Sequence, residues 1–194
     1  MTLTPRDKAT DPGNDQLPLS LHHSAVPVRD MEVTRAFMED ILHMPMVACW
    51  TEATVMPESN RAIPYCHTFF ALADGSNVAY FQFADPEYAE KVFLRVGPEI
   101  NRFYHLALRT TRTYQIGLIE RLKANDIPYR ITNHGYVKSL YVTSPDDLQF
   151  EFANAPPDEE VVNELGRSTA HAALAKWMAG DHGTLNNPFR GRDF

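Results

Sequence analysis

The stretch that decides the fold is His23-Ser-Ala-Val-Pro-Val28, because a related stretch, His105-Leu-Ala-Leu-Arg-Thr110, begins 82 positions later. Both follow the pattern His-x-Ala, and both are rich in residues that favour strands. Self-similarity at a fixed spacing is the sequence signature of a repeated structural unit. The chain is therefore predicted to contain two copies of one module, each opened by a strand that begins at a histidine.

A helix is predicted about seven residues after each of these histidines. Asp30 can cap the first helix and Thr111 the second, since short oxygen-bearing side chains accept hydrogen bonds from the N–H groups of a first helical turn. Residues with helical spacing follow each cap: Val33, Phe37 and Ile41 in the first helix, and Gln115, Leu118, Ile119 and Leu122 in the second. Strand-like stretches come after each helix.

The two halves also end alike, since Phe81-Gln-Phe-Ala-Asp85 matches Phe150-Glu-Phe-Ala-Asn154 at a shift of 69 positions. The shorter shift is explained by a longer insertion in the first half, around Trp50 to Cys66, which is either a lid over a pocket or a surface excursion. The order strand, helix and several strands occurs twice. We predict an α+β fold in which two βαβββ modules form one curved-sheet metal-binding domain over residues 20–154.

The flanking segments differ in character from this paired domain. Residues 1–19 lack periodicity and are predicted to be a flexible N-terminal arm. Residues 155–194 are predicted to form a C-terminal helix, capped by Asp158, and an extended tail. The apolar face of that helix packs either on its own domain or on a second subunit, and a homodimer is the commonest oligomer.

Composition excludes several classes of protein. The formal charge of −7 over 194 residues argues against nucleic-acid binding, which requires clustered Lys and Arg. No apolar run approaches the roughly 20 residues of a membrane span, and the polar N-terminus does not resemble a secretory signal, so we expect a cytoplasmic protein. Two cysteines, Cys49 and Cys66, match no zinc pattern and make no disulfide framework. The expected partner is a small molecule.

His23, His105 and Glu151 are the candidate metal ligands. Because side chains alternate along a strand, His105 shares a face with Ala107, whereas the larger neighbouring leucines take the other face. Glu151 stands between two phenylalanines, where a carboxylate is costly unless it is paired or binds a metal. Two His and one carboxylate leave open coordination positions for substrate and O2. A single strand histidine is more often a hydrogen-bonded core residue, but all three stand at module-equivalent positions.

The choice between the adjacent His22 and His23 rests on the repeat. Only His23 aligns with His105 through the alanine two residues later. His22 is therefore expected to point away from the metal, either at the surface or against the helix.

The opening stretch resembles the start of vicinal oxygen chelate superfamily domains. Leu-His-His-Ser-Ala-Val-Pro-Val-Arg-Asp, followed by Phe-Met-Glu-Asp-Ile-Leu, is similar to the family pattern of His-x-Ala, Asp and Phe-Tyr-x-x-x-Leu-Gly over a match of about residues 20–154. Met38 replaces the usual Tyr and His43 the usual Gly. The resemblance implies that the metal ligands are His23, His105 and Glu151.

Within this superfamily, the stretch from Ser139 to Glu151 resembles the closing segment of extradiol ring-cleavage dioxygenases. Tyr141 stands ten residues before Glu151, as the family tyrosine does, and a turn would place the two side chains on one face about 5 Å apart. His134 resembles a second histidine near the substrate hydroxyl. The resemblance implies that Tyr141 and His134 are catalytic and handle the protons of a metal-bound diol; the alternatives are a packing tyrosine and a loop histidine.

Two departures bear on the reaction. The family's acid/base histidine would fall near Ser76 or Asn77, where no histidine stands, and the nearest is His67. Gln82 occupies the place of a glutamate that isomerases of the superfamily use as a fourth ligand and base; an amide binds metal weakly and takes no proton. Three protein ligands are therefore expected.

Three functions remain open from the sequence. The first is an extradiol-type dioxygenase that uses Fe(2+) and O2 on a catechol-like aromatic, with Mn(2+) or another divalent metal as the alternative cofactor. Residues available for its pocket are Phe69, Tyr80, Phe81 and Tyr136. The second is a metal-dependent isomerase, epimerase or lyase. The third is a non-catalytic ligand-binding or resistance protein.

Overall fold

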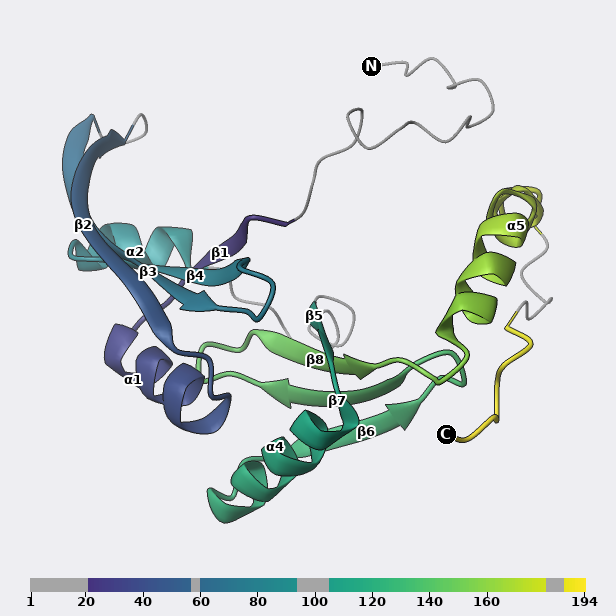
Figure 1. Ribbon diagram of the computed structural model, residues 1–194. Helices are drawn as coiled ribbons and strands as arrows, with labels where there is room; N and C mark the ends of the chain where they lie inside the picture. The colour runs from purple at the N-terminus through teal and green to yellow at the C-terminus, as the bar shows by residue number, and fades with distance from the viewer. Residues whose placement is uncertain (1–20, 57–59, 94–104, 181–186) are drawn as a thin grey trace. The chain divides into compact units, whose positions relative to one another are not determined.

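The computed structural model describes residues 21–56, 60–93, 105–180 and 187–194, and it divides into two compact units at residues 94 and 95. The predicted N-terminal arm, residues 1–19, lies outside the described residues. Each unit contains one of the two predicted modules (Figure 1). No helix among the described residues is long and apolar enough to cross a membrane.

The first unit is a βαβββ module followed by a short helix. Its elements are β1 (His23–Pro27), α1 (Met31–Ala36), η2 (Phe37–Ile41), β2 (Met46–Met56), β3 (Arg61–Ala71), β4 (Asn77–Phe83) and α2 (Pro86–Val92). The four strands lie in the order β1-β4-β3-β2, with β1 parallel to β4 and the other pairs antiparallel.

The second unit repeats this order. Its elements are β5 (His105–Thr110), α4 (Arg112–Ala124), β6 (Tyr129–Asn133), β7 (Lys138–Thr143), β8 (Gln149–Asn154) and α5 (Glu159–Met178). The sheet order is β5-β8-β7-β6, with β5 parallel to β8. The α+β fold of two βαβββ modules is thus confirmed. Whether both modules act as the one domain predicted over residues 20–154 stays a prediction.

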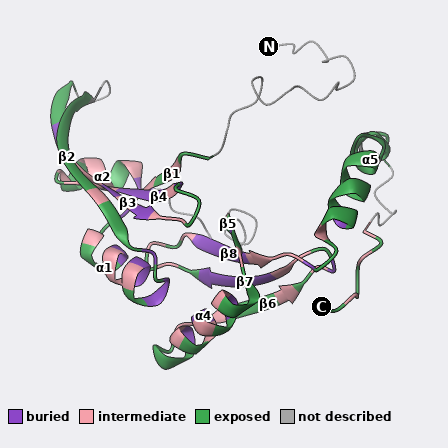
Figure 2. Ribbon diagram, in the orientation of Figure 1, coloured by how far each residue is buried: buried purple, intermediate pink, exposed green. Residues whose placement is uncertain are grey.

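The predicted helix caps are present in both modules. The Asp30 carboxylate accepts hydrogen bonds from the N–H groups of Glu32 and Val33, and the Thr111 hydroxyl accepts one from Tyr114. Leu118 and Leu122 of α4 are fully buried, and Figure 2 shows buried stretches along β7 and β8 of the same unit. The side chains of Asp30 and Thr111 therefore set where the two helices begin.

The first helix departs from the predicted apolar face. Val33 is 46% exposed, whereas Phe37, Met38 and Ile41 are buried. Thr34, not Val33, is the buried residue of α1, and the π-helical turn η2 that follows begins at Phe37. The helical face that packs on the sheet therefore runs through Thr34 in place of Val33.

The insertion in the first half is part of a regular hairpin. Strands β2 and β3 pair from Met46 to Met56 and from Arg61 to Ala71, and Trp50 lies opposite His67. Residues 57–59 lie outside the described residues. The extra length therefore extends two strands, and the described part of the insertion is sheet.

Strand register corrects the predicted equivalence of Gln82 and Glu151. In β1, Ala25 lies beside Ala79, and in β5 the matching Ala107 lies beside Glu151. The residue equivalent to Glu151 is therefore Ala79, three positions before Gln82. A shift by an odd number of residues moves a side chain to the other face of a strand, and the Gln82 amide oxygen accepts a hydrogen bond from Met31 N at the start of α1.

Candidate metal centre

His105 and Glu151 meet on the sheet face of the second unit that α4 does not cover. The Nε2 atom of His105 lies 2.8 Å from Oε2 of Glu151, and Glu151 is only 8% exposed. In the sheet, His105 lies beside Gln149 and Ala107 lies beside Glu151. Two of the three predicted ligands are thus within hydrogen-bond distance of one another.

Ser139 holds the other oxygen of the carboxylate. Its hydroxyl, in the fully buried start of β7, donates to Glu151 Oε1 over 2.5 Å. Such a second contact fixes the plane of a carboxylate and directs its remaining lone pairs. The sequence reasoning treated Ser139 only as the first residue of the closing segment, and its place beside Ala153 in the β7–β8 ladder explains the contact.

Tyr141 lies directly opposite Glu151 in the β7–β8 ladder, which confirms the predicted cross-strand pair. Its hydroxyl is 3.2 Å from Nε2 of His134, and the guanidinium of Arg130 lies 4.0 Å above its ring. Burial raises the pKa of the Tyr141 phenol, and the neighbouring Glu151 carboxylate raises it further. The structure therefore brings His134 and Tyr141 together; their catalytic roles stay predictions.

His23 lies in the first unit with a different set of neighbours. Its ring centroid is 5.4 Å from that of Phe69 and 5.9 Å from that of His67. His22 is exposed at the surface, as one of the two predicted alternatives has it, but its ring does not point away from His23, because the Nδ1 atoms of the two rings are 2.7 Å apart. His22 precedes the first paired residue of β1, where strand alternation no longer separates neighbouring side chains.

An aromatic layer covers the open face of the first sheet, the face opposite α1. It consists of Tyr65, His67, Phe69, Phe81 and Phe83, which alternate along β3 and β4. The His67 ring stacks on Phe81 at 3.7 Å between centroids. Phe81 and Phe83 lie on the open face, whereas Phe150 and Phe152 lie on the face opposite to that of Glu151. Matching the two Phe-x-Phe stretches by sequence therefore aligned residues that belong to different faces.

Tyr80, by contrast, is not available for a pocket on this face. It is 2% exposed, and its hydroxyl donates to the Met38 sulfur in η2. Adjacent residues of a strand face opposite ways, so Tyr80 belongs to the core on the helix side while Phe81 belongs to the aromatic layer.

Two buried polar atoms on these open faces have no hydrogen-bond partner among the described residues. They are Nε2 of His67 and Nε2 of Gln149. Burial lowers the pKa of His67, and the nearby His23 lowers it further. Buried polar atoms are normally satisfied, so these two are candidate contacts for a bound molecule. The sequence carries a signal for both positions, because residues two apart on a strand share a face: His67 shares one with Phe69, and Gln149 shares one with Glu151.

The donor set fits a divalent cation. Imidazole nitrogen and carboxylate oxygen bind iron, manganese and zinc, and the Glu151 oxygen beside His105 keeps lone pairs that Ser139 does not use. Within the described residues of either unit taken alone, no three His, Cys, Asp or Glu side chains are arranged to hold a metal. His105 and Glu151 by themselves therefore offer one imidazole nitrogen and one carboxylate oxygen.

Comparison with known proteins gives structural matches. No family model matches the sequence, and no curated protein matches it either. The fosfomycin resistance protein FosX of Listeria monocytogenes is 18% identical, with a TM-score of 0.51 over 74% of this chain and 98% of that one. A glyoxylase/bleomycin resistance protein/dioxygenase domain from Frankia is 15% identical, with a TM-score of 0.51 over 71% and 93%.

A variant of the Listeria protein was solved with Mn(II) and 1S,2S-dihydroxypropylphosphonic acid; it is 16% identical, with a TM-score of 0.50 over 75% of this chain and 99% of that one. Identities this low establish a shared fold. The chain therefore shares the fold of these solved structures, which in this protein consists of two βαβββ modules.

Proposed function

We propose that the protein is a divalent-metal-dependent enzyme that acts on a small molecule bearing two neighbouring oxygens. Its metal ligands are His23, His105 and Glu151. The observation that carries the proposal is the 2.8 Å contact between His105 and the buried Glu151 carboxylate, on the sheet face opposite α4. A buried carboxylate in such a place is costly without a cation or a strong hydrogen-bond partner.

The internal repeat supports His23 as the third ligand. His23 and His105 each begin the first strand of a module, and each lies beside the first residue of the closing strand, Asn77 or Gln149. Each is followed two residues later by an alanine on the same face. Ala79, at the position equivalent to Glu151, has no ligand atom, so the site has three protein ligands.

When bound, the metal supplies Lewis-acid polarisation of the substrate oxygens. Ser139 keeps the Glu151 carboxylate in one orientation throughout. Tyr141 and His134, 3.2 Å apart, hold and pass a proton at the phenol oxygen and at Nε2, across the ladder from Glu151. The unpartnered amide nitrogen of Gln149, beside His105, is a donor for a substrate oxygen.

The structural neighbours support Lewis-acid chemistry of the isomerase, epimerase or lyase kind. The Listeria protein holds Mn(II) together with a molecule that carries two adjacent hydroxyl groups. Paired oxygens of this sort suit chelation by one cation with open positions. We infer that the substrate is a vicinal diol, aromatic or not, or a compound that is converted into one.

An extradiol dioxygenase that uses Fe(2+) and O2 is the second candidate. The specific observation in its favour is the placement of Tyr141 opposite Glu151 with His134 at its hydroxyl. A phenol and an imidazole beside a metal-bound catechol can share its two protons. The aromatic layer of the first sheet offers ring faces that suit a catechol.

The test begins with metal binding. The protein is stripped with a chelator and titrated with Mn(2+) and Fe(2+) under anaerobic conditions, with calorimetry and thermal unfolding as readouts. Glu151→Gln should weaken binding at least ~10-fold, since an amide is a poor ligand. Glu159→Gln, which changes an exposed ion pair with Arg109, is the matched control and should bind like the parent. Equal affinity in Glu151→Gln and the parent would contradict the proposed site.

The reaction is then assigned by substrate conversion. A panel of vicinal diols, epoxides and catechols is offered to the metal-loaded protein with and without O2. Conversion without O2 supports Lewis-acid chemistry, and oxygen uptake with catechols supports the dioxygenase. Tight binding of ligands without any turnover would overturn both enzymes in favour of a binding or resistance protein.

A further inference from the structure

The turn between β6 and β7 carries His134, and its conformation is unusual. Gly135 has a φ of +82°, a conformation that residues with a side chain rarely adopt. The Asn133 side-chain oxygen accepts a hydrogen bond from Gly135 N over 2.8 Å, and His134 N donates to Val137 O over 2.9 Å. The main chain of this turn determines where the His134 ring lies.

Residues 187–194, which we call the strap, bind the outer side of this turn. Asn187 Nδ2 donates to the His134 carbonyl over 3.0 Å, and Arg192 Nε donates to the Gly135 carbonyl over 3.1 Å. The carbonyl groups of His134 and Gly135 are thus both bonded to strap side chains. Neither bond involves the imidazole, which stays directed at Tyr141.

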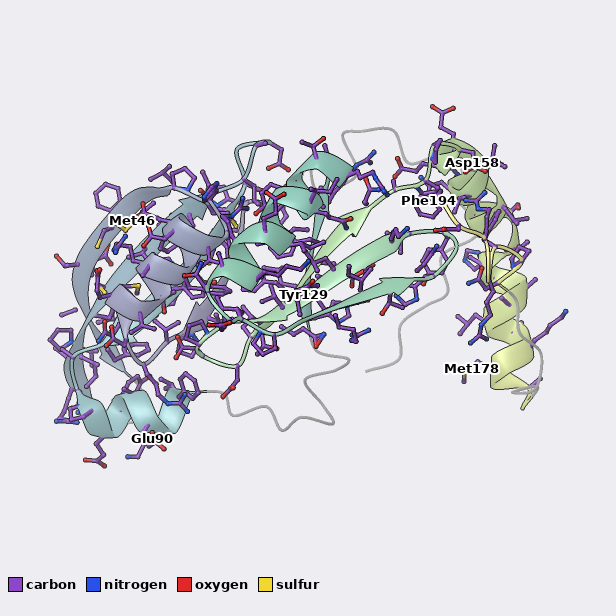
Figure 3. All side chains as sticks on the ribbon, turned by 90° about the horizontal axis from the view of Figure 1, so that it is seen from below. Met46, Glu90, Tyr129, Asp158, Met178 and Phe194 are labelled. Atoms are coloured by element: carbon purple, nitrogen blue, oxygen red, sulfur yellow. The ribbon has the colours of Figure 1, made fainter. Side chains whose placement is uncertain are left out.

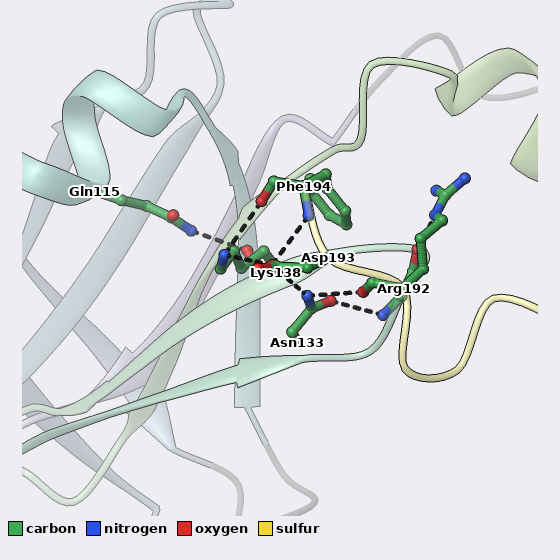
Figure 4. Close-up of polar contacts among 7 residues, drawn as sticks. Gln115, Asn133, Lys138, Arg192, Asp193 and Phe194 are labelled. Atoms are coloured by element: carbon green, nitrogen blue, oxygen red, sulfur yellow. Dashed lines mark hydrogen bonds and ion pairs between the residues drawn. The ribbon is translucent and has the colours of Figure 1, made fainter.

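The strap is itself anchored at three places in the second unit: the ends of β6 and β7 that face the turn, as Figure 4 shows, and the residue that precedes α5. Asn133 Nδ2 at the end of β6 donates to Arg192 O and to the Asp193 carboxylate. Lys138 Nζ at the start of β7 donates to the Asp193 carboxylate and to Phe194 O. The strap therefore bridges the two strand ends that flank the turn.

The third anchor is α5. Arg192 Nη1 lies 2.5 Å from the carboxylate of Asp158, which precedes the helix. Figure 3 shows Asp158 and Phe194 near one another at this end of α5, with Met178 at the other end. One guanidinium thus links the start of α5 to the Gly135 carbonyl.

The packing between strap and turn leaves no space. A Cβ atom on Gly135 would collide with the carbonyl group of Phe189. Phe189 N in turn donates to Asn187 Oδ1, so the strap is folded around its own first residue. Glycine is required here both by the positive φ and by the closeness of the strap.

We propose that Asn187 and Arg192 are positioning residues for His134. By holding the carbonyls of His134 and Gly135, they keep the His134 ring at hydrogen-bond distance from Tyr141. Without these two donors, water hydrates the His134 and Gly135 carbonyls, and the main chain of the turn becomes more mobile. Because a misplacement of about 1 Å can cost a catalytic group ~100-fold in rate, this placement matters for proton transfer. The catalytic consequence, but not the placement itself, rests on the proposed function.

The test uses two single variants of the full chain. Asn187→Asp keeps the oxygen that Phe189 N binds and removes the donor to His134 O. Arg192→Ala removes the donor to Gly135 O. Arg61→Ala is the matched control, because Arg61, like Arg192, pairs with an aspartate that directly precedes a helix, Asp85, but does so in the first unit.

The first readout needs no knowledge of the reaction. Histidine-ring NMR signals, assigned with His134→Gln, and hydrogen exchange of the His134 amide report on the turn. Both strap variants should shift the His134 ring signals and speed exchange of its amide ~10-fold or more, as local opening becomes easier, while Arg61→Ala matches the parent. Unchanged signals and exchange in both strap variants would overturn the proposal. If Arg192→Ala does not fold, Arg192→Gln replaces it.

The second readout is the effect on the proposed reaction. The strap variants should lower kcat ~10-fold or more and leave the metal affinity within about twofold, since they touch no ligand. An equal loss of metal affinity would make the strap merely structural and overturn the positioning role. If the parent shows no turnover, the proposed function fails, and the NMR and exchange data still decide the placement.

Discussion

The Nε2 atom of His105 lies 2.8 Å from Oε2 of Glu151, although the two residues are not direct neighbours in the β5–β8 ladder. The residue beside Glu151 is Ala107, and the residue beside His105 is Gln149. The contact is therefore diagonal. It is allowed because the small methyl side chain of Ala107 leaves the space beside the carboxylate to the imidazole of His105.

Ser139 should be the residue outside the ligand set that matters most for the metal. Ser139→Ala removes the hydroxyl that donates to Glu151 Oε1 in a fully buried place. We expect metal affinity to fall ~10–100-fold, as is usual when an outer partner of a ligand is lost. The free energy of unfolding without metal should fall by about 1–3 kcal/mol, because a buried acceptor loses its donor.

Calorimetry with Mn(2+) and chemical denaturation measure these two effects. Ser168→Ala is the control, since the Ser168 hydroxyl bonds Leu165 O on the exposed face of α5. Parent-like metal affinity in Ser139→Ala would show that the hydrogen bond does not orient the ligand.

Gly135→Ala should weaken docking of the strap and lower stability. The φ of +82° costs an alanine about 1 kcal/mol or more, and the collision with Phe189 adds to this. Gly75→Ala separates the two causes, because Gly75 has a φ of +87° and open space around its missing side chain. Thermal unfolding and hydrogen exchange of residues 187–194 should therefore show a larger effect for Gly135→Ala; equal effects would mean that the collision is relieved at no cost.

Acid should release the strap. Arg192 holds the pKa of Asp158 below its ordinary value, and Lys138 does the same for Asp193. A carboxyl whose pKa is lower in the folded state stabilises that state above its unfolded pKa of about 3.9 and loses this effect as pH falls through the folded pKa. The anchoring should thus be complete at pH 5 to 7 and fade below about pH 4.

Hydrogen exchange of residues 187–194, corrected for the intrinsic effect of pH, measures this release. In Asp193→Asn the part of the pH dependence due to Asp193 should be absent. Release that begins well above pH 5 in the parent would point to groups other than these two carboxyls.

His67→Phe should leave the fold as stable as the parent or stabilise it by about 1 kcal/mol, because it replaces a ring with an unpartnered buried nitrogen by an apolar ring of similar shape. The pKa of His67 is lowered in the folded state, so protonation favours the unfolded chain and the parent loses stability as pH falls below about 6.5. The gain from the substitution should therefore grow from pH 7 to pH 5.5.

Thermal unfolding at several pH values checks this, with His171→Phe on the exposed part of α5 as the control. If the Nε2 atom contacts the substrate, His67→Phe should also lower turnover while the protein is more stable. A destabilised His67→Phe would show that the nitrogen has a partner that the protein's own residues do not supply.

The local signals in the sequence were sufficient for the modules. The His-x-Ala repeat located β1 and β5, and Asp30 and Thr111 marked the starts of their helices. Glu151 was identified as a buried carboxylate from its two phenylalanine neighbours alone. Each of these features depends on residues within one turn or one strand, where alternation and capping act over a few positions.

Only the tertiary structure decided which residues share a face across strands. The register of β1 on β4 made Ala79, and not Gln82, the counterpart of Glu151, because pairing register is set by contacts between segments distant in sequence. The same long-range packing put His67 into the aromatic layer and brought the strap onto the His134 turn. The sequence by itself determined the repeated βαβββ order and the candidate ligands, while tertiary packing determined the residues that contact those candidates, such as Ser139 at Glu151.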